Sequence, residues 1–568
     1  MSKAMLPPAD TALSARQIEA TPGLASLRAC NERFADIGPD LVAAVLEEAA
    51  RLAAERLGPL GAATDSVPEL KEERVRLSGA HQAAWQDFVA GGWHAMDIDP
   101  EAGGQGLPLI LAVAAQSLFD RSLPAFGMLP VGTRAAARLL AAFGDAALRE
   151  SWLPRMAAGE WTASICISEV GAGSDLARMR TMARRAPGGG WTITGEKQWI
   201  SFGDHDLAER IGHCLLARTE TAKGLSLFLV PDRLEDGSRN GVFTRRIEDK
   251  LGLHHSPTCA LGFEEAEAML LGEEGRGLAQ IFVMIVQMRL AVGATGLGIA
   301  SGAADLALGY AGERRQGGRG AEPTALCEHA DVQRMLLSMA SDVEVLRGLI
   351  LATAVQADLA DHAPEAAERQ KASALLQWFL PLIKTVGGET AFDTASEAIQ
   401  ILGGAGYTTE WPAEQALRDA RVLTIFEGTT GMQALDLLHR RLWQGDAAGL
   451  RLFLQHARRD LVDASGAAAA ALASTLDRLE ATAERMLAMR DNPRDAEAGA
   501  NAFLDLAGLA SRGWIALRLS KLDGDATARK LAALGEYWLT RLDARSAAAA
   551  HDALLGAGRL DAFVHLRP

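Results

Sequence analysis

One carboxylate stands at an unusual place in this sequence. The stretch "RVLTIFEGTTGMQALDLLHRRL" (421–442) places Glu427 after a mostly apolar, strand-like run and before a leucine-rich helical pattern. Burial in a dry pocket raises the pKa of a carboxyl group toward neutrality, where it can act as a base. A charge beside a helix start, with Thr429 or Thr430 as the cap, explains the same residue without chemistry. On this stretch alone both interpretations stay open.

Two further stretches carry groups that suit a planar or anionic ligand. "CISEVGAGSD" (166–175) turns through glycines after a strand-like start, and it offers backbone N–H groups with the hydroxyls of Ser168 and Ser174. "GEKQWIS" (195–201) places Trp199 and Ser201 on one face of a strand, because side chains alternate with a period of two. An indole beside a hydroxyl could stack on a flat ring and bond its edge. An ordinary turn and a core tryptophan are the alternatives.

Glycines and arginines mark two more candidate positions. "QILGGAGY" (400–407) ends a helical pattern with a double glycine, which a C-terminal glycine cap explains without any ligand. Arg314 and Arg315 precede a glycine-rich loop at 314–323. Taken alone, these arginines fit a solvated helix end as well as a phosphate-binding pair.

Composition excludes several classes of protein. The chain has 568 residues, of which 49% are hydrophobic and 23% charged, so several packed units are expected. A net charge of −15 argues against a duplex nucleic-acid binder. The five cysteines lack metal-ligand spacing, which predicts no metal site and favours a reducing, cytoplasmic compartment. The apolar segment 290–304 is too short to span a membrane, and its glycines and alanines suit close helix packing.

The elements that must position these residues follow the order helical, β, helical. Helical periodicity dominates up to about residue 160, short β-branched and aromatic runs separated by turns follow, and the helical period then returns. We expect a mainly α protein with an inserted β domain: an N-terminal helical domain at 1–161, a middle β-barrel domain at 162–272, a C-terminal four-helix bundle at 273–445 and an extra helical domain at 446–568. A GxGxxG between a strand and a helix is missing, which disfavours a nicotinamide Rossmann enzyme.

Five of these stretches together resemble the motifs of the acyl-CoA dehydrogenase family. "SEVGAGSD" is similar to the family's T-E-P-G-A-G-S-D signature, "KQWIS" to its K-x-W-I-[ST] strand, "QILGGAGY" to its glycine turn and "IFEGTTGMQ" to its catalytic I-[YF]-E-G-T segment. The fifth stretch is the arginine-containing loop at 314–323. The resemblance covers about 41–442 in family order. It implies FAD-dependent formation of a trans double bond between the α and β carbons of an acyl-CoA, with hydride transfer to flavin N5.

The resemblance also implies roles for individual residues. Glu427 falls on the base that removes the α proton, and the alternative glutamate that some members carry before Arg289 is absent from "VMIVQMRLAVG". Substrate contacts fall on Ser174, Arg289 and Gly428. The implied FAD contacts are Ile167, Ser168, Ser174, Trp199, Ser201, Arg314, Gln316, Gln400, Gly403, Gly404 and Thr429. Arg314 and Gln316 would reach the FAD of a neighbouring subunit, so a homodimer or a dimer of dimers is expected.

Three departures from the family pattern and several alternatives remain. Val170 replaces a proline, Gly317 stands where an aromatic is common, and Val286 occupies a position that is usually Asn or Asp. The long tail resembles a subclass that includes the 3-methylmercaptopropionyl-CoA dehydrogenases, so 3-methylthiopropanoyl-CoA and other short or medium acyl-CoA thioesters are the candidate substrates. The implied electron acceptor is an electron-transferring flavoprotein. An oxidase of the same fold that uses O₂, or a non-catalytic relative that binds nucleic acid or a partner, are the alternatives.

Overall fold

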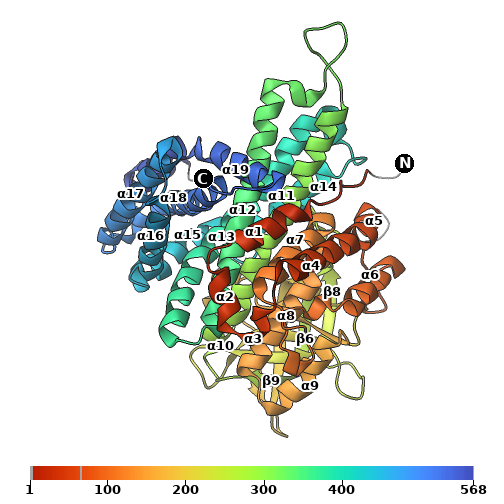
Figure 1. Cartoon of the computed structure of the whole chain (residues 1–568). Coiled ribbons are helices and arrows are strands. Elements are labelled where there is room, and N and C mark those ends of the chain that lie inside the picture. The colour runs from red at the N-terminus through yellow and green to blue at the C-terminus, as the bar shows by residue number, and fades with distance from the viewer. Residues whose placement is uncertain (1–3, 64–66, 567–568) are drawn as a thin grey trace. The chain divides into compact units, whose positions relative to one another are not determined.

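A computed structural model describes residues 4–63 and 67–566 of the chain (Figure 1). The described residues form two compact units, and each unit is assembled from separate segments of the chain. The first unit draws on 1–50, 108–121 and 292–568, and the second on 51–107 and 122–291. Because this division follows spatial contacts rather than chain order, the four consecutive domains expected above stay a prediction.

Within its described residues, the first unit is built from helices. Its main helices are α1 (Thr11–Ala20), α2 (Leu24–Cys30), α3 (Glu32–Ala35), α4 (Pro39–Leu52), α7 (Leu109–Ser122), α11 (Phe282–Glu313), α12 (Ala330–His362), α13 (Ala366–Leu402), α14 (Ala413–Ala420), α15 (Thr430–Leu435), α16 (Ala448–Leu461), α17 (Gly466–Ala488), α18 (Pro493–Ser520), α19 (Ala526–Leu539) and α20 (Leu542–Ala553). α11 begins in the second unit, and the division falls within it.

Close contact between helices explains the small residues of α11. A Cβ on Gly296 would lie 2.3 Å from the carbonyl oxygen of Gly387 in α13, and one on Gly298 would lie 2.6 Å from the carbonyl oxygen of Ser117 in α7. The stretch Gly277–Glu313 is long and apolar enough to cross a membrane, but 78% of its most apolar window is buried inside the protein. It is therefore a core helix, as the glycine and alanine content predicted.

Replacing Gly296 with alanine should destabilise the first unit. The added methyl group would meet the backbone of α13, which cannot move aside without separating two helices, so we expect a loss of about 1–3 kcal/mol in unfolding free energy. Gly312→Ala on the same helix is the matched control, because nothing lies within 4 Å of its Cβ position. Urea unfolding of both variants tests this, and equal effects would contradict it.

The C-terminal tail packs on its own chain. Helices α16 to α20, drawn in blue in Figure 1, contact one another, and α16, α18 and α19 also contact α12 or α13. The N-terminal α1 joins the same assembly, where Ser14 accepts a hydrogen bond from Arg347 at 2.8 Å and Gln17 donates one to Glu344 at 2.6 Å. The tail is thus part of the first unit's core.

The second unit combines short helices with a sheet. Its helices are α5 (Gly58–Ala62), α6 (Gly79–Ala90), α8 (Pro124–Phe143), α9 (Ala146–Ala157) and α10 (Gly277–Gln280). Its strands are β1 (Glu69–Lys71), β2 (Arg74–Arg76), β3 (Trp161–Cys166), β4 (Met182–Arg185), β5 (Trp191–Ser201), β6 (Arg210–Thr219), β7 (Leu225–Pro231), β8 (Val242–Ile247) and β9 (Thr258–Leu271). The small β1–β2 hairpin lies in a region where only helices were predicted.

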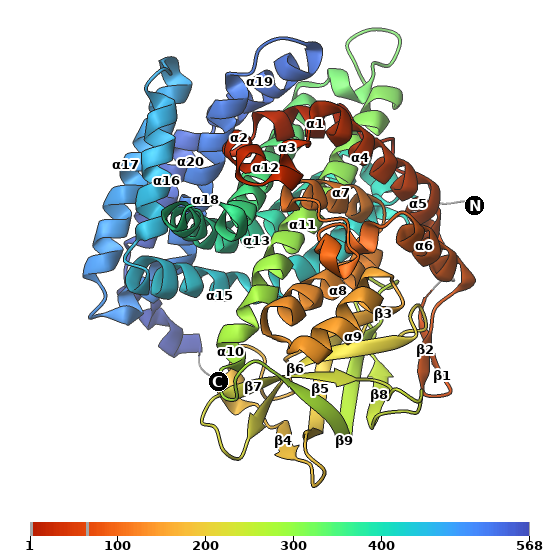
Figure 2. The same ribbon diagram turned by 60° about the horizontal axis from the view of Figure 1, so that its bottom comes forward.

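Five strands close into the expected barrel (Figure 2). The ring runs β6-β4-β5-β9-β7 and back to β6, with β3 paired to β6 and β8 paired to β9 outside it. Strands β6 and β7 are almost wholly buried, which explains their continuous apolar sequences "CLLA" and "LSLFLV". Closure leaves few strand edges of the sheet unpaired. The predicted ligand-binding stretches lie at the end of β3 (166–175) and in the last residues of β5 (195–201).

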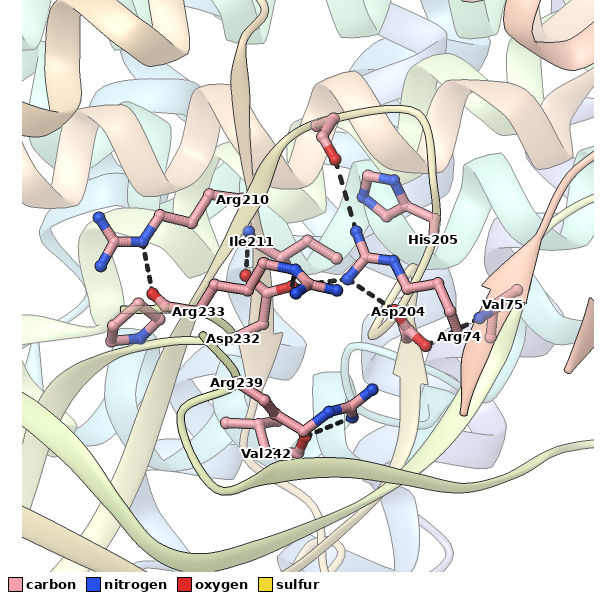
Figure 3. A network of polar contacts seen from close by, with 12 residues as sticks. Arg74, Val75, Asp204, His205, Arg210, Ile211, Asp232, Arg233, Arg239 and Val242 are labelled. Carbon is pink, nitrogen blue, oxygen red and sulfur yellow. Dashed lines mark hydrogen bonds and ion pairs between the residues drawn. The ribbon is translucent and has the colours of Figure 1, made fainter. Parts of the chain in front are cut away.

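An arginine joins the hairpin to the barrel (Figure 3). Arg74 of β2 lies 2.7 Å from Asp232 and 3.2 Å from Asp204, and both carboxylates also accept backbone N–H groups, from Ile211 and Val75. All three charged side chains are about nine-tenths buried. A cavity of about 10 Å³ beside them has room for one water molecule. The cluster is a satisfied structural ion network.

Buried histidines make the second unit sensitive to mild acid. Burial lowers the pKa of His213 to about 4, against 6.5 for an exposed imidazole, and its Nδ1 lies 2.8 Å from the hydroxyl of Ser164. The unfolded chain therefore binds a proton that the folded chain does not between pH 6.5 and 4, and stability falls with pH there. From pH 7 to 5 we expect a loss of about 2 kcal/mol from this residue.

Chemical unfolding at pH 7 and pH 5 measures this effect. His213→Asn should show a smaller fall in stability between the two pH values than the wild type, whereas replacing the exposed His551 should leave the difference unchanged. Equal pH dependence in the wild type and the His213 variant would show that His213 is not the group that titrates.

Candidate active site

The Glu427 segment forms a strained turn in the first unit. Residues Arg421–Thr424 are a 3-10 helix and α15 starts at Thr430, so the strand predicted before Glu427 is wrong. Glu427 has φ +54° and Gly428 has φ +89°. A glutamate in the left-handed region costs about 1–2 kcal/mol, and such strain is concentrated at functional sites. The expected cap is confirmed at Thr429, whose hydroxyl accepts the N–H of Met432 at 3.3 Å.

Two buried side chains hold the carbonyl groups of this turn. Lys384 of α13 donates from Nζ to the Gly428 oxygen at 2.6 Å. Gln433 of α15 donates from Nε2 to the oxygens of Glu427 and Gly428 at 3.0 and 3.2 Å. Lys384 and Gln433 are fully buried, while Glu427 itself is half-buried. Sequence reasoning missed both donors, although a lysine within the apolar run "WFLPLIKTVGG" is a readable signal.

The loop after β3 is anchored by a buried ion pair in the second unit. Lys197 of β5 donates to the Glu169 carboxylate at 2.9 Å and to the carbonyl oxygen of Ile167 at 3.0 Å. Glu169 also accepts the hydroxyl of Thr181 at 2.6 Å and the backbone N–H groups of Arg180 and Thr181. Both charged residues stand inside the quoted motifs, but only the structure shows that they pair.

The charge state of Glu169 follows from these contacts. Burial alone would raise its pKa, but the Lys197 charge and the hydrogen bonds outweigh burial and hold the pKa below the usual value. The carboxylate is therefore ionised at neutral pH and fixes the start and end of the loop. Gln198 N–H completes the anchoring by donating to the Ser168 oxygen at 2.9 Å.

Trp199 presents its indole outward from β5. It has φ +62° and is 55% exposed, at a point where the β5–β9 register shifts between Lys197 and Ile200. The regular alternation predicted for this strand is thus interrupted by a bulge. Ser201 follows two residues later and is half-buried. A large aromatic held exposed in a strained conformation suits stacking against a flat ligand better than packing in a core, which was the alternative.

Polar positions predicted on the first unit lie at two helix ends. α11 ends at Glu313, and Arg314 and Gln316 follow in an exposed loop whose backbone pairs with Thr324 and Leu326. α13 ends at Leu402 with Gly403 at φ +62°, as the glycine-cap interpretation predicts. The two helix ends share a core cluster that includes Leu306 and Ala398. The residues exposed at these two helix ends are Arg314, Gln316, Gln400, Gly403 and Gly404, and Thr429 is exposed at the start of α15.

The predicted residues thus fall into two sets, one in each unit. Ile167, Ser168, Ser174, Trp199 and Ser201 belong to the barrel unit, as does Arg289, which is 8% exposed in the first half of α11. The second set belongs to the helical unit and consists of Arg314, Gln316, Gln400, Gly403, Gly404, Glu427, Gly428 and Thr429.

Helices, a closed β-barrel and further helices follow one another in this order along the chain. Three family models match along the chain: the N-terminal domain of acyl-CoA dehydrogenase at residues 42–160, the middle domain at 164–266 and the C-terminal domain at 275–442. The chain belongs to the acyl-CoA dehydrogenase family, and it is an acyl-CoA dehydrogenase, an oxidoreductase that acts on CH–CH groups.

Two curated relatives are similar over most of the chain. The 3-methylmercaptopropionyl-CoA dehydrogenase of Ruegeria pomeroyi is 36% identical over 526 residues, which cover 88% of each protein. The broad-specificity linear acyl-CoA dehydrogenase FadE5 of Mycobacterium tuberculosis is 34% identical and covers 72% of this chain and 71% of that protein. The alignment with the first relative is longer than the stretch that the family models match.

Solved structures show that the fold extends to the whole chain. Caenorhabditis elegans ACDH-11, solved with C11-CoA, aligns with a TM-score of 0.78 at 21% identity and covers all of this chain and 96% of that one. A Bacillus anthracis acyl-CoA dehydrogenase solved with FAD aligns with a TM-score of 0.71 at 20% identity, covering 94% and 90%. The C-terminal helices are therefore part of a known architecture.

Proposed function

We propose that Glu427 removes the α proton of an acyl-CoA thioester and that the product is the trans-2-enoyl-CoA. The observation that carries the proposal is the turn of Glu427 and Gly428, in which an acid keeps a left-handed backbone under the hold of Lys384 and Gln433. A strained acid at a helix start is not needed for folding, whereas a base must have one orientation relative to the proton it takes. Bound FAD supplies the acceptor for the hydride that leaves the β carbon.

Two sets of residues are proposed to hold FAD. In the barrel unit, the exposed indole of Trp199 offers a stacking surface, and the anchored loop offers Ile167, Ser168 and Ser174, with Ser201 at the end of β5. These groups fit an isoalloxazine ring, which has two flat faces and a polar edge. On the helical unit, the exposed Arg314 and Gln316 would reach the diphosphate and adenosine of the FAD of a neighbouring subunit. The exposed residues Gln400, Gly403, Gly404 and Thr429 would contact the adenine-side half of FAD. A homodimer or a dimer of dimers follows.

Three further residues are proposed to contact the substrate. Ser174 and Arg289 would contact the CoA part, and the backbone beside Gly428 the thioester. For the acyl group, the similarity to the Ruegeria relative over 88% of both chains supports 3-methylthiopropanoyl-CoA, and the similarity to FadE5 supports linear acyl chains. Other short or medium acyl-CoA thioesters stay candidates.

Anaerobic titration of the purified FAD protein with a panel of acyl-CoA thioesters tests this proposal. The panel should include 3-methylthiopropanoyl-CoA, butyryl-CoA, octanoyl-CoA and an aromatic acyl-CoA. Bleaching of the flavin absorbance by at least one thioester is expected, and the smallest amount that bleaches fully identifies the preferred acyl group. Failure of all of them to bleach would refute the proposed site.

An electron-transferring flavoprotein is the proposed electron acceptor, and the same-fold oxidase is the alternative. Reoxidation of the substrate-reduced protein separates them: rapid reoxidation by the flavoprotein with slow reaction in air supports the dehydrogenase, and rapid formation of hydrogen peroxide in air supports the oxidase. With a net charge of −15, we propose no nucleic-acid or membrane partner and a cytoplasmic location.

A further inference from the structure

The turn that carries Glu427 depends on contacts from outside itself. A left-handed glutamate followed by a left-handed glycine is a backbone state that an isolated chain rarely populates. Such a conformation persists only where the surrounding structure over-determines it. The structure must therefore contain groups that select this state, and the hydrogen bonds to its carbonyl oxygens show which groups these are.

Gln433 and Lys384 fix the two peptide groups that follow the Glu427 Cα. The amide of Gln433 donates to the oxygens of both Glu427 and Gly428, which locks the peptide planes at 427–428 and 428–429 relative to each other. Lys384 then holds the Gly428 oxygen at 2.6 Å from a different helix, so the turn is tied to α13 as well as to α15. Fixing these planes relative to each other fixes φ and ψ at Gly428, and it holds the peptide group that follows the Glu427 Cα against α13 and α15.

α13 is built to approach the turn closely. Gly388, one turn after Lys384, touches the segment that leads to Glu427: a Cβ there would lie 3.1 Å from the carbonyl carbon and oxygen of Leu423. Leu423 is itself fully buried in a core cluster with Ala391 of α13, and Phe426 packs against that cluster. The backbone before Glu427 and the backbone after it thus both contact α13.

Burying the Lys384 side chain costs free energy, which indicates that this side chain has a specific role. Its side chain is fully buried, next to the buried Leu382, Ile383 and Val386. Removing an ammonium group from water costs several kcal/mol unless charged and polar partners compensate it, and a methionine would fill similar space without that penalty. Glu389 interacts electrostatically with Lys384, and Lys384 donates to the carbonyl oxygen beside the proposed base, so the buried cation is placed where it can hold the turn.

We propose that Lys384 and Gln433 are positioning residues that hold the Glu427–Gly428 turn in its left-handed state and so aim the Glu427 carboxylate at the substrate. This inference rests on the proposed role of Glu427. Lys384→Met and Gln433→Leu remove the donors at similar volume, and Lys384→Arg keeps a charged donor. Lys371→Met, an exposed lysine of the same helix, is the matched control.

The first readout is kinetic. We expect Lys384→Met and Gln433→Leu to lower kcat per bound flavin by roughly 10²-fold with KM within about 3-fold, because a small misplacement of a catalytic group costs that much rate. Lys384→Arg should recover most of the loss, and Lys371→Met should match the wild type. Unchanged kcat per flavin in Gln433→Leu, or a loss confined to protein stability and flavin content, would overturn the proposal.

The second readout asks whether the two residues act through Glu427. In a Glu427→Gln background, Gln433→Leu should reduce the residual rate by less than about 2-fold, since the group that it positions is already gone. An equal further loss in that background would overturn the inference while leaving the proposed function intact. Full turnover by Glu427→Gln alone would instead refute the proposed function.

The third readout does not depend on activity. Amide hydrogen exchange of residues 426–430 should become at least about 10-fold faster in Gln433→Leu, with little change in the rest of α13 and α15, because the turn loses the contacts that select it. Unchanged exchange in this segment would show that the hydrogen bonds do not hold the turn and would overturn the proposal.

Discussion

Replacing Glu427 with glutamine is expected to leave a folded yellow protein that no acyl-CoA can bleach. The amide keeps the size of the side chain and the left-handed turn, whose carbonyl groups are still held by Lys384 and Gln433. It cannot accept the α proton, so the rate of flavin reduction should fall by about 10²–10⁴-fold, the usual contribution of a positioned general base. Stopped-flow reduction by the preferred thioester measures this.

A matched control separates loss of the base from loss of charge. Glu410→Gln removes an exposed carboxylate in the same unit and should leave the rate of flavin reduction unchanged. The segment "VMIVQMRLAVG" before and after Arg289, where some family members carry the alternative glutamate, contains no acid that could replace Glu427. Reduction of the Glu427→Gln protein at the wild-type rate would mean that the base is another residue.

Replacing Lys197 with methionine should produce the largest loss of stability among single changes around the loop after β3, which is proposed to contact the flavin. The Lys197 side chain is fully buried and that of Glu169 is 9% exposed, so the substitution leaves a carboxylate in the interior without its counter-charge. Breaking a buried pair in this way costs about 3–5 kcal/mol. The loop also loses the bond to the Ile167 oxygen, so a fall in flavin content should accompany the lower unfolding free energy.

The unfolding free energies of the wild type and of Lys197→Met should also depend on pH in different ways. In the wild type the Glu169 pKa is lowered, so its contribution is present above the unfolded value of 4.5 and is lost as the pH falls through the folded value. Without Lys197, burial favours the protonated form of Glu169, so the variant should lose less stability on mild acidification than the wild type does. Urea unfolding followed by tryptophan fluorescence at several pH values measures both curves.

An exposed pair provides the comparison for this change. Arg184 and Glu220 lie 3.2 Å apart, but they are 63% and 68% exposed, so solvent screens their attraction. Arg184→Met should therefore cost less than about 1 kcal/mol and leave the flavin content unchanged. A similar loss in the two variants would show that burial does not set the strength of the Lys197–Glu169 pair.

The order of elements and the candidate residues could be read from the sequence because both are local properties. The run "WTITGEKQWIS", which is rich in β-branched and aromatic residues, and the helical periodicity before residue 160 are local signals, and β5 and α4 form where they predict. The glycine cap at Gly403 and the helix cap at Thr429 depend on neighbours within a few residues. The fold class follows from the same local signals, since helices, a barrel and helices succeed one another along the chain.

Partners distant in the sequence were decided only by the tertiary structure. A period shows that a face is buried but not what buries it, so the packing of α1 on α12 and of the tail on α13, and the pairing of β5 with β9, had no local signal. The same holds at the proposed site. The apolar residues before Glu427 suggested a strand, but they form a 3-10 helix, since the segment packs on Gly388 and its turn is held by Lys384, 44 residues away. The sequence by itself led to Glu427 as the proposed base. Tertiary contacts determined the left-handed backbone conformation of this residue.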